Sequence, residues 1–267
     1  MNKEKKSVVD FWDKASCGEL LYLNDKTLEG FNNEQKIRYK LEPYIIPFAA
    51  FDEFKDKRVL EIGVGLGSDH QMFCEFGAKL WGIDLSKRAV KNTKTRFANL
   101  GLKSNLTVGD AEKMKFDSNF FDLVYSWGVI HHSPDTVNAI NEIYRVLKPG
   151  GIAKIMIYHK WSFVGYMLWI RYALFRLKPW LTLDYIYKYY LESPGTKAYS
   201  KSNAKELFSN FSEVSIKTVL THADLLIGDA GITKEDIMLK LAKKIWPRSI
   251  IKALFKKHGL FMMIQAK

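Results

Sequence analysis

The sequence predicts an α/β protein in which a mostly parallel, seven-stranded sheet is doubly wound and carries helical additions. The first observation is the alternation of short apolar runs with helical patterns between residues 58 and 158. This rhythm is typical of a parallel sheet covered on both faces. The second is a run of alternating glycines, Gly63, Gly65 and Gly67, directly after an apolar run. It indicates a strand that turns sharply into a helix near a nucleotide-like ligand.

The elements are expected in the following order. Strands are predicted over 58–62, 79–84, 105–108, 120–126 and 151–158, with helices over 67–76, 86–100 and 135–147. Ser86 is a suitable N-cap and Gly101 ends the second helix. Pro149-Gly150-Gly151 ends the third helix. A helix over 202–209 and strands over 214–220 and 260–265 complete the core.

We expect one structural domain with four parts. Residues 1–56 are predicted to form a helical cap, with amphipathic pieces at 8–12 and 37–54, and residues 57–159 the cofactor-binding core. Residues 160–200 are predicted to form an aromatic and basic insertion for the substrate, in which two helices break near Lys178-Pro179. Residues 201–267 return to the core and carry a basic helical insertion at about 222–258, with helices over 233–244 and 249–257.

Composition excludes several classes of protein. With 267 residues and 47% hydrophobic content, the chain can bury one substantial core. Cys17 and Cys74 stand in no metal-binding spacing, so we expect no disulfide framework and no metal. The charged N-terminus lacks the apolar stretch of a signal peptide, and no charge-free run approaches the ~20 residues that span a bilayer. A cytoplasmic protein is expected, with peripheral contact to a membrane surface as a further option.

Most of the net charge of +12 lies in two segments. Residues 160–190 hold five Lys or Arg against one acid, and residues 234–258 hold eight against two. Because ten of the twelve excess charges lie there, among aromatic residues, the pattern favours a directed surface over general nucleic-acid binding. One interpretation is docking on an anionic membrane. The other is that the apolar faces pack on the core, or form a substrate pocket, while the lysines are solvated.

A second signal supports the glycine run. Trp81-Gly82-Ile83-Asp84 reads as a strand that ends in an acid, seventeen residues beyond Gly67, where a carboxylate would hold a ribose diol. In dinucleotide enzymes the third glycine comes one residue later, at the position that Ser68 occupies here. The pattern therefore disfavours a nicotinamide-dependent reductase.

At these residues the chain resembles the class I S-adenosylmethionine-dependent methyltransferases, in the group that includes the ubiquinone- and menaquinone-type enzymes. The resemblance covers roughly residues 57–158 and continues at Gly109-Asp110-Ala111-Glu112, at 121–132 and at 146–151. It implies a Rossmann-like methyltransferase fold and S-adenosylmethionine as the cofactor. It also implies methyl transfer to an oxygen or nitrogen of a small or amphipathic acceptor, such as a lipid or quinone.

The resemblance also implies roles for single residues. Asp84, with Leu85 beside it, would hold the ribose, and Glu61 the methionine end of the cofactor, while the three glycines admit the cofactor to the backbone. Asp110 would contact the adenine amino group and Ala111 would pack beside the base. Trp127 would either face the sulfonium as a cation–π partner or simply pack.

Candidates for a general base follow the fourth and fifth strands. His131 and His132 resemble a pair in many relatives, and an imidazole can accept a proton near neutral pH. The alternative for each is loop hydrogen bonding. His159 and Tyr158 are equal rivals at the end of the strand over 151–158, if that end faces the same mouth.

Substrate contacts and the acceptor are less defined by the sequence. Arg38 and Tyr39 resemble lid positions, and Trp161, Lys197 and Tyr199 lie in the segment expected to meet the substrate. Nucleic acid is disfavoured because Ser126-Trp127-Gly128-Val129 stands where many base methyltransferases carry Asn or Asp, two prolines and an aromatic. An RNA methyltransferase and an inactive cofactor-binding or assembly module stay as alternatives. The intact Glu61 and Asp84 argue against the inactive module, and the sequence does not indicate the oligomeric state.

Overall fold

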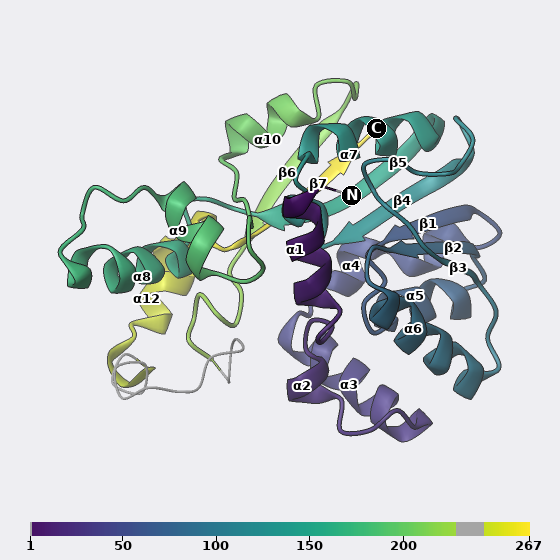
Figure 1. The fold of residues 1–267 in the computed structure, drawn as a ribbon, viewed down its shortest axis with the longest axis horizontal. Helices are drawn as coiled ribbons and strands as arrows, with labels where there is room; N and C mark the ends of the chain where they lie inside the picture. Colours follow the sequence, from purple (N-terminus) through teal and green to yellow (C-terminus); the bar gives the residue numbers. More distant parts are fainter. Residues whose placement is uncertain (1, 228–242) are drawn as a thin grey trace.

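A computed structural model of the chain describes residues 2–227 and 243–267. It contains the expected seven-stranded sheet, in the order β3-β2-β1-β4-β5-β7-β6 (Figure 1). The strands are β1 (Arg58–Ile62), β2 (Lys79–Asp84), β3 (Asn105–Val108), β4 (Phe121–Trp127), β5 (Leu147–Tyr158), β6 (Val214–Val219) and β7 (Phe261–Ala266). β1 to β5 pair in parallel, whereas β7 is antiparallel to both β5 and β6. The doubly wound, mostly parallel α/β fold is therefore confirmed.

The strand order reverses between β1 and β4. From β1 the chain moves outward to β2 and β3, and it then returns to the other side of β1 as β4 and β5. At such a switch point the connections diverge to opposite faces, which leaves a crevice beyond the carboxyl ends of the two central strands. The glycine run follows β1, and Trp127-Gly128-Val129 follows β4, so both segments meet at this crevice.

The core helices form where the local signals place them. They are α5 (Ser68–Glu75), α6 (Lys87–Leu100), α7 (Thr136–Val146) and α10 (Lys201–Leu207). The Ser86 hydroxyl accepts a hydrogen bond from Ala89 N, and Gly101 ends α6 at φ 66°. The ends of α7 and β5 differ from the prediction, because β5 begins at Leu147 rather than at residue 151. Pro149-Gly150-Gly151 lies in an irregular stretch of β5, where the register against β4 shifts.

Helices cover both faces of the sheet, as the continuous apolar runs of the strands require. One buried cluster joins the sheet to α7 and α10, through residues such as Ile140 and Phe208. A second cluster joins it to α5 and to the 3-10 helix η1 (Phe51–Phe54), through Phe73 and Phe51. Leu60 and Val124 of the central strands are fully buried between these layers.

The front segment folds into four short helices before η1. They are α1 (Lys3–Trp12), α2 (Glu19–Tyr22), α3 (Leu28–Leu41) and α4 (Ile45–Ala49). The piece predicted over 8–12 covers the second half of α1, and the piece predicted over 37–54 covers the end of α3 together with α4 and η1. The Thr27 hydroxyl, which accepts a hydrogen bond from Gly30 N, is the cap that marks the true start of α3. A buried ion pair of 2.8 Å between Arg96 of α6 and Glu34 of α3 ties this segment to the core.

A lobe extends to one side of the sheet (Figure 1). It contains α8 (Phe163–Tyr172), α9 (Leu183–Tyr190), α12 (Arg248–Leu254) and the 3-10 helices η3 (Leu174–Arg176) and η4 (Lys256–His258). The break between α8 and α9 spans the predicted position at Lys178-Pro179. The helix expected over 249–257 corresponds to α12 and η4, whereas nearly all of the one expected over 233–244 lies outside the described residues.

Candidate active site

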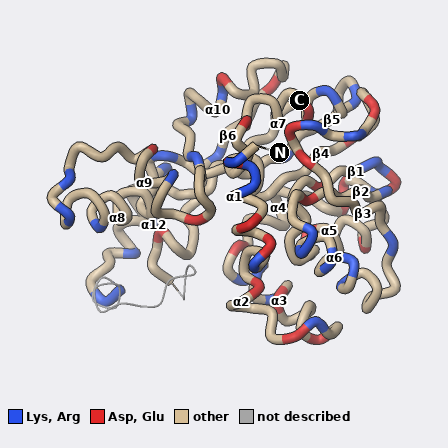
Figure 2. Tube along the Cα trace, viewed as in Figure 1, with Lys and Arg blue, Asp and Glu red and all other residues tan. Residues whose placement is uncertain are grey.

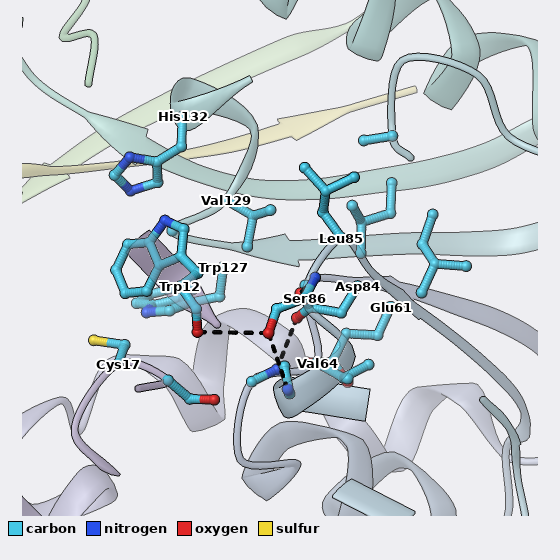
Figure 3. Close-up of a pocket in the computed structure, with 18 of the residues that line it drawn as sticks. Trp12, Cys17, Glu61, Val64, Asp84, Leu85, Ser86, Trp127, Val129 and His132 are labelled. Carbon is cyan, nitrogen blue, oxygen red and sulfur yellow. Dashed lines mark hydrogen bonds between the residues drawn. The ribbon is translucent and has the colours of Figure 1, made fainter. Parts of the chain in front are cut away.

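A pocket opens at the carboxyl ends of β1, β2 and β4, under α1. Its floor is formed by residues 61–69, 83–86, 109–111 and 127–129, and its roof by Lys5, Val8, Val9 and Trp12 of α1. Figure 3 shows the two ends of this pocket. One end is lined by Asp84, Leu85 and Ser86, and the other by Trp12, Cys17, Trp127 and His132. The pocket thus joins the glycine run to side chains from remote segments.

The glycine loop has the backbone conformation that its sequence predicts. Gly63, Gly65 and Gly67 have φ values of 82°, 53° and 81°, in the region that side chains rarely adopt. A Cβ at Gly63 would lie 2.1 Å from Val129 Cγ2. At Gly65 a Cβ would meet no atom within 4 Å, because this backbone borders the pocket. The loop can therefore admit a ligand to its main chain.

Asp84 presents a fixed carboxylate to the pocket. Its Oδ2 accepts a hydrogen bond of 3.2 Å from Gly65 N, and its Oδ1 accepts one of 2.9 Å from Ser86 N. Burial raises the pKa of Asp84 to about 6, although these backbone donors stabilise the charged form. A partly buried carboxylate with free lone pairs is a strong acceptor for two neighbouring hydroxyls. The structure thus places Asp84 in the pocket, and its contact with a ribose diol stays a prediction.

Glu61 is oriented by a residue that the sequence patterns did not single out. Its Oε2 lies 2.8 Å from His70 Nδ1 in a hydrogen bond, and His70 Nε2 is hydrogen-bonded to Ser104 Oγ at 2.7 Å. Burial raises the pKa of Glu61 and lowers that of His70 to about 3. Glu61 lines the pocket, whereas His70 does not. The position of His70 in the first turn after the glycine run was the only available signal.

Asp69, at the start of α5, joins the cap to the core. Arg38 donates two hydrogen bonds to it, of 3.1 and 2.7 Å, and the Tyr39 hydroxyl donates one of 3.0 Å. The buried Tyr125 hydroxyl donates another of 2.9 Å. Arg38 lines the pocket and Tyr39 does not. Sequence patterns missed Asp69, because its partners lie about thirty or more residues away along the chain.

Asp110 and Ala111 lie at the Asp84 end of the pocket, under the first turn of α1. Lys5 Nζ lies 2.6 Å from Asp110 Oδ2 and also pairs with Glu112. The two carboxylates raise the pKa of Lys5 against its partial burial. This pair of contacts holds α1 over the pocket. Lys5 and Trp12 therefore belong to the site, although no sequence signal marked them.

Trp127 is held rigidly at the other end. Its Nε1 donates a hydrogen bond of 3.2 Å to Glu42 Oε2. Its ring stacks on Tyr44, with centroids 6.0 Å apart and an interplanar angle of 25°. The indole therefore has one fixed orientation at the pocket wall.

The two adjacent histidines have different surroundings. His132 lines the pocket, and its Nδ1 is hydrogen-bonded to Ser193 Oγ at 2.8 Å and Thr196 Oγ1 at 3.1 Å. His131 is fully buried outside the lining, with its ring centroid 4.0 Å from that of Tyr158. Burial lowers the pKa of His132 to about 3. Burial, together with the charges of His132 and Lys197, holds the pKa of His131 well below its usual range. Both imidazoles are therefore uncharged near neutral pH, and the role of either one as a general base stays a prediction.

Five further candidates lie outside the pocket lining. The Tyr158 hydroxyl donates to Glu192 Oε2 at 2.8 Å, behind the lining. Lys197 Nζ donates to the carbonyls of Ser133 and Pro134 and so secures a loop. Trp161 is 48% exposed on the lobe.

The expectation that His159 faces the mouth of the pocket is wrong. Successive strand side chains point to opposite faces, so His159 points away from Tyr158. His159 Nδ1 is hydrogen-bonded to Gly259 O at 3.2 Å. Tyr199 pairs with His159 in an isolated bridge and is also absent from the lining.

Comparison with protein families identifies the central part of the chain. Residues 60–155 match the family model described as "Methyltransferase domain". This match covers part of β1, the strands β2 to β4, most of β5 and the glycine run. The fold is thus that of a class I methyltransferase domain, and S-adenosylmethionine is its cofactor.

Curated relatives match the same region. A phosphoethanolamine N-methyltransferase of Caenorhabditis elegans is 37% identical over 113 residues, which are 41% of this chain and 26% of that protein. A sterol 4-C-methyltransferase of the same organism is 34% identical over 101 residues, 37% of this chain and 30% of that protein. A protein of Oryza sativa subsp. japonica, named as a probable tocopherol O-methyltransferase, is 36% identical over 108 residues, 39% of this chain and 29% of that protein. The match thus spans less than a third of these relatives.

Solved structures resemble this chain over nearly its whole length. A chain from a complex between the Haloferax volcanii Trm112 methyltransferase activator and a methyltransferase has a TM-score of 0.60 and 16% identity, covering 97% of this chain and 96% of that one. A methyltransferase from Archaeoglobus fulgidus has a TM-score of 0.54 and 18% identity, covering 90% of this chain and 97% of that one. At this identity the likeness shows the fold alone.

Proposed function

We propose that this chain, which carries a class I methyltransferase domain over residues 60–155, transfers a methyl group to an oxygen or nitrogen of a small or amphipathic, lipid-like acceptor. The observation that supports it is the two-ended pocket of Figure 3. Asp84 and the glycine loop at one end suit the cofactor, and Trp12, Cys17, Trp127 and His132 at the other leave a separate wall for an acceptor.

The side chains would act mainly by positioning. S-adenosylmethionine supplies a methyl group on a positively charged sulfur. Asp84 would accept hydrogen bonds from the ribose hydroxyls, and Glu61 would orient the amino-acid end. The roof formed by α1 would exclude water, and the fixed face of Trp127 would stabilise positive charge beside it. Alignment of donor and acceptor in such a dry site supplies much of the rate of an in-line transfer.

The class of acceptor rests on the relatives. Their names refer to phosphoethanolamine, a sterol and tocopherol, which are lipids or lipid precursors. In this chain the acceptor end combines the indoles of Trp12 and Trp127 with polar groups, and such a wall suits an amphipathic molecule. We extend the proposal to this class on that basis.

The direct test uses methyl-labelled cofactor. The pure protein is incubated with it and with cell extract separated into lipid, polar metabolite, protein and RNA fractions. We expect label in the lipid or the polar metabolite fraction. Label only in RNA would support an RNA methyltransferase instead. Stoichiometric cofactor binding without transfer to any fraction would identify the inactive binding module.

The lobe carries an apolar and basic surface suited to a membrane. Leu177 is 83% exposed and Trp180 72%, and Phe175 is 63% exposed between Leu174 and Arg176. In Figure 2, Lys and Arg outnumber acids around α8, α9 and α12. Within residues 2–227 and 243–267, no helix is both long and apolar enough to span a bilayer. We propose that this surface docks peripherally on anionic lipid, with aromatics at headgroup level.

Removing charge from this surface should release the protein from anionic vesicles. With Lys252, Lys256 and Lys257 changed to Gln, we expect affinity to fall by about two orders of magnitude at low salt, since each cation near the surface contributes ~1 kcal/mol. The measurement is co-sedimentation with vesicles of phosphatidylcholine alone or mixed with phosphatidylserine. High salt should weaken wild-type binding, because it shortens the Debye length.

The matched control removes the same charge from the core, with Lys91, Lys94 and Lys103 changed to Gln. These residues lie on or after α6, away from the lobe. If both triple variants lost the same affinity for anionic vesicles, binding would depend on the net charge of the protein and not on a docking surface. Wild-type binding that ignores lipid charge would contradict the membrane proposal.

A further inference from the structure

Two buried hydroxyls, of Ser193 and Thr196, meet one nitrogen of His132. Ser193 Oγ lies 2.8 Å and Thr196 Oγ1 3.1 Å from His132 Nδ1, both in hydrogen bonds. The two hydroxyls stand at the ends of one turn, which Thr196 N closes by donating to Ser193 O at 3.2 Å. Pro194 is the second residue of this turn and Gly195, at φ 88°, the third, which is the pattern of a type II turn. The turn therefore presents both hydroxyls from a restricted backbone.

The residue after this turn fastens it to the loop that carries His132. Lys197 N donates a hydrogen bond of 3.1 Å to His131 O, and Lys197 Nζ donates to the carbonyls of Ser133 and Pro134. His132, Ser133 and Pro134 all line the pocket. The turn thus fixes this part of the pocket wall without lining it.

The protons of the two hydroxyls determine where the imidazole carries its own proton. Thr196 Oγ1 donates to Ser193 O at 2.7 Å. Because a hydroxyl has a single proton, Thr196 Oγ1 must act as an acceptor toward His132 Nδ1. The Ser193 hydroxyl, 3.4 Å from Thr196 Oγ1, then donates to that oxygen and also accepts from Nδ1. In this arrangement every proton has a partner, and His132 carries its proton on Nδ1.

His132 Nε2 is left as a buried acceptor without a partner. Burial lowers the pKa of His132 to about 3, so the ring is neutral and has no second proton for Nε2. No group in the part of the chain that the structure describes forms a hydrogen bond with this nitrogen. Glu192 Oε2 lies 3.5 Å from it and has the Tyr158 hydroxyl as its donor. A buried acceptor of this kind is costly unless a ligand or water completes it.

The position of His132 indicates which ligand would complete it. The ring lies beside Trp12, with centroids 5.3 Å apart, at the end of the pocket opposite Asp84 (Figure 3). The ribose of the cofactor is expected at Asp84, so the donor to Nε2 is expected from the methyl acceptor. A hydroxyl or a primary or secondary amine has such a donor. A tertiary amine, a thioether or an alkene carbon has none.

We propose that Ser193 and Thr196 are positioning residues that hold His132 in the tautomer with its proton on Nδ1, and that Nε2 accepts a hydrogen bond from the O–H or N–H group that is methylated. This inference rests on the proposed function and narrows its acceptor to groups that carry a donor hydrogen. It assigns a role to two residues that no sequence signal marked.

The hydrogen bond to Nε2 restricts the rotation of the acceptor group. Such restriction contributes to the rate of an in-line transfer, because the entropy of alignment is lost on binding and not at the transition state. Without the two hydroxyls the imidazole would carry its proton on either nitrogen. A proton on Nε2 would then face the donor of the acceptor molecule, and the hydrogen bond would be lost.

The first measurement is the tautomer of His132. The chain has six histidines, and nuclear magnetic resonance of protein labelled with 15N at histidine distinguishes protonated from unprotonated ring nitrogens. The variant His132→Phe identifies the His132 signals. We expect Nδ1 to be protonated and Nε2 unprotonated in wild type. Combining Ser193→Ala with Thr196→Val should produce a mixture of both tautomers.

Two control variants isolate the hydroxyl from the fold. Thr196→Ser keeps the hydroxyl and should keep the wild-type tautomer. Thr218→Val removes another buried threonine hydroxyl, which donates to Lys257 O outside the pocket lining. It should leave the His132 signals unchanged.

The second measurement uses two probes that differ in one donor hydrogen, benzyl alcohol and benzyl methyl ether. Each is titrated into protein saturated with S-adenosylhomocysteine. We expect the alcohol to bind about two- to tenfold more tightly, the fold-change of one neutral hydrogen bond, and to shift the Nε2 signal of His132. The ether should leave this signal in place. The preference should disappear in His132→Phe and fall in the variant that lacks both hydroxyls.

The outcomes separate this inference from the proposed function. A proton on Nε2 in wild type, or equal affinities for alcohol and ether, would overturn the inference while bound S-adenosylhomocysteine leaves the methyltransferase intact. A wild-type protein that does not bind S-adenosylhomocysteine would overturn the proposed function, and the inference with it. If the variant without both hydroxyls melts early, Thr196→Val alone replaces it. A pure wild-type tautomer in Thr196→Val would then exclude Thr196 as a positioning residue.

Discussion

Replacing Asp84 by Ala should weaken the binding of S-adenosylmethionine and of its demethylated product by about ten- to a hundredfold. Loss of a charge-assisted contact to the ribose costs on the order of 1.5–3 kcal/mol. The carboxylate is already oriented by Gly65 N and Ser86 N, so no other group can replace it without rearrangement. Calorimetric titration of wild type and variant measures the change. An unchanged affinity would remove Asp84 from the site.

The same carboxylate should make cofactor affinity depend on pH. Its pKa is raised from 3.8 to about 6 in the folded protein, so the fold binds an extra proton between these values. The contribution of Asp84 to folding stability therefore falls as pH rises from about 4 to 6. Cofactor affinity should rise over the same window, because the ribose needs the charged acceptor. The control Asp84→Asn should bind weakly and without this rise.

Changing Gly63 to Ala should destabilise the fold by about 2–5 kcal/mol. The left-handed conformation costs a side chain roughly 1–2 kcal/mol, and overpacking adds typically 1–3 kcal/mol. Both apply here, since φ is +82° and the new Cβ would lie 2.1 Å from Val129 Cγ2. Denaturant unfolding followed by circular dichroism measures the free energy of unfolding.

The matched control for this variant is Gly101→Ala. Gly101 also has a positive φ, of +66°, but a Cβ there meets no atom within 4 Å. In this variant the free energy of unfolding should fall by only ~1 kcal/mol, because the strain of the backbone acts alone. If the free energy of unfolding fell equally in the two variants, Val129 would have moved aside. The loop after β4 would then not be packed tightly against the glycine run.

The parts of the fold that were predicted depend on local signals. The glycine run needs left-handed backbone at Gly63, Gly65 and Gly67, and no other residue type adopts it as readily. Ser86 and Gly101 cap α6 through groups within a few residues. The front segment was only partly predicted, because α3 has weak amphipathic character and is held by the buried pair of Glu34 and Arg96, 62 residues apart.

Parts of the site depended on long-range contacts. Asp69 orients Arg38 across 31 residues, and Glu192 meets Tyr158 across 34. No spacing rule connects such pairs, since their separation depends on the lengths of the intervening elements. Glu42 and Glu192 were therefore absent from the expected site, although they contact Trp127 and His132 of the pocket lining.

The sequence by itself determined the doubly wound sheet and the glycine turn after β1. These two features follow from periodicity and turn chemistry within short windows of sequence, which do not depend on the rest of the chain. S-adenosylmethionine as the cofactor was implied by the resemblance of these windows to the class I methyltransferases. Only the tertiary structure decided which candidates reach the pocket. His132 lines it, whereas His159, one residue after Tyr158 on β5, is turned to Gly259. The direction of a strand side chain depends on its place in the alternation along the strand and on the distant strand that pairs with it. Neither can be read from the residue itself.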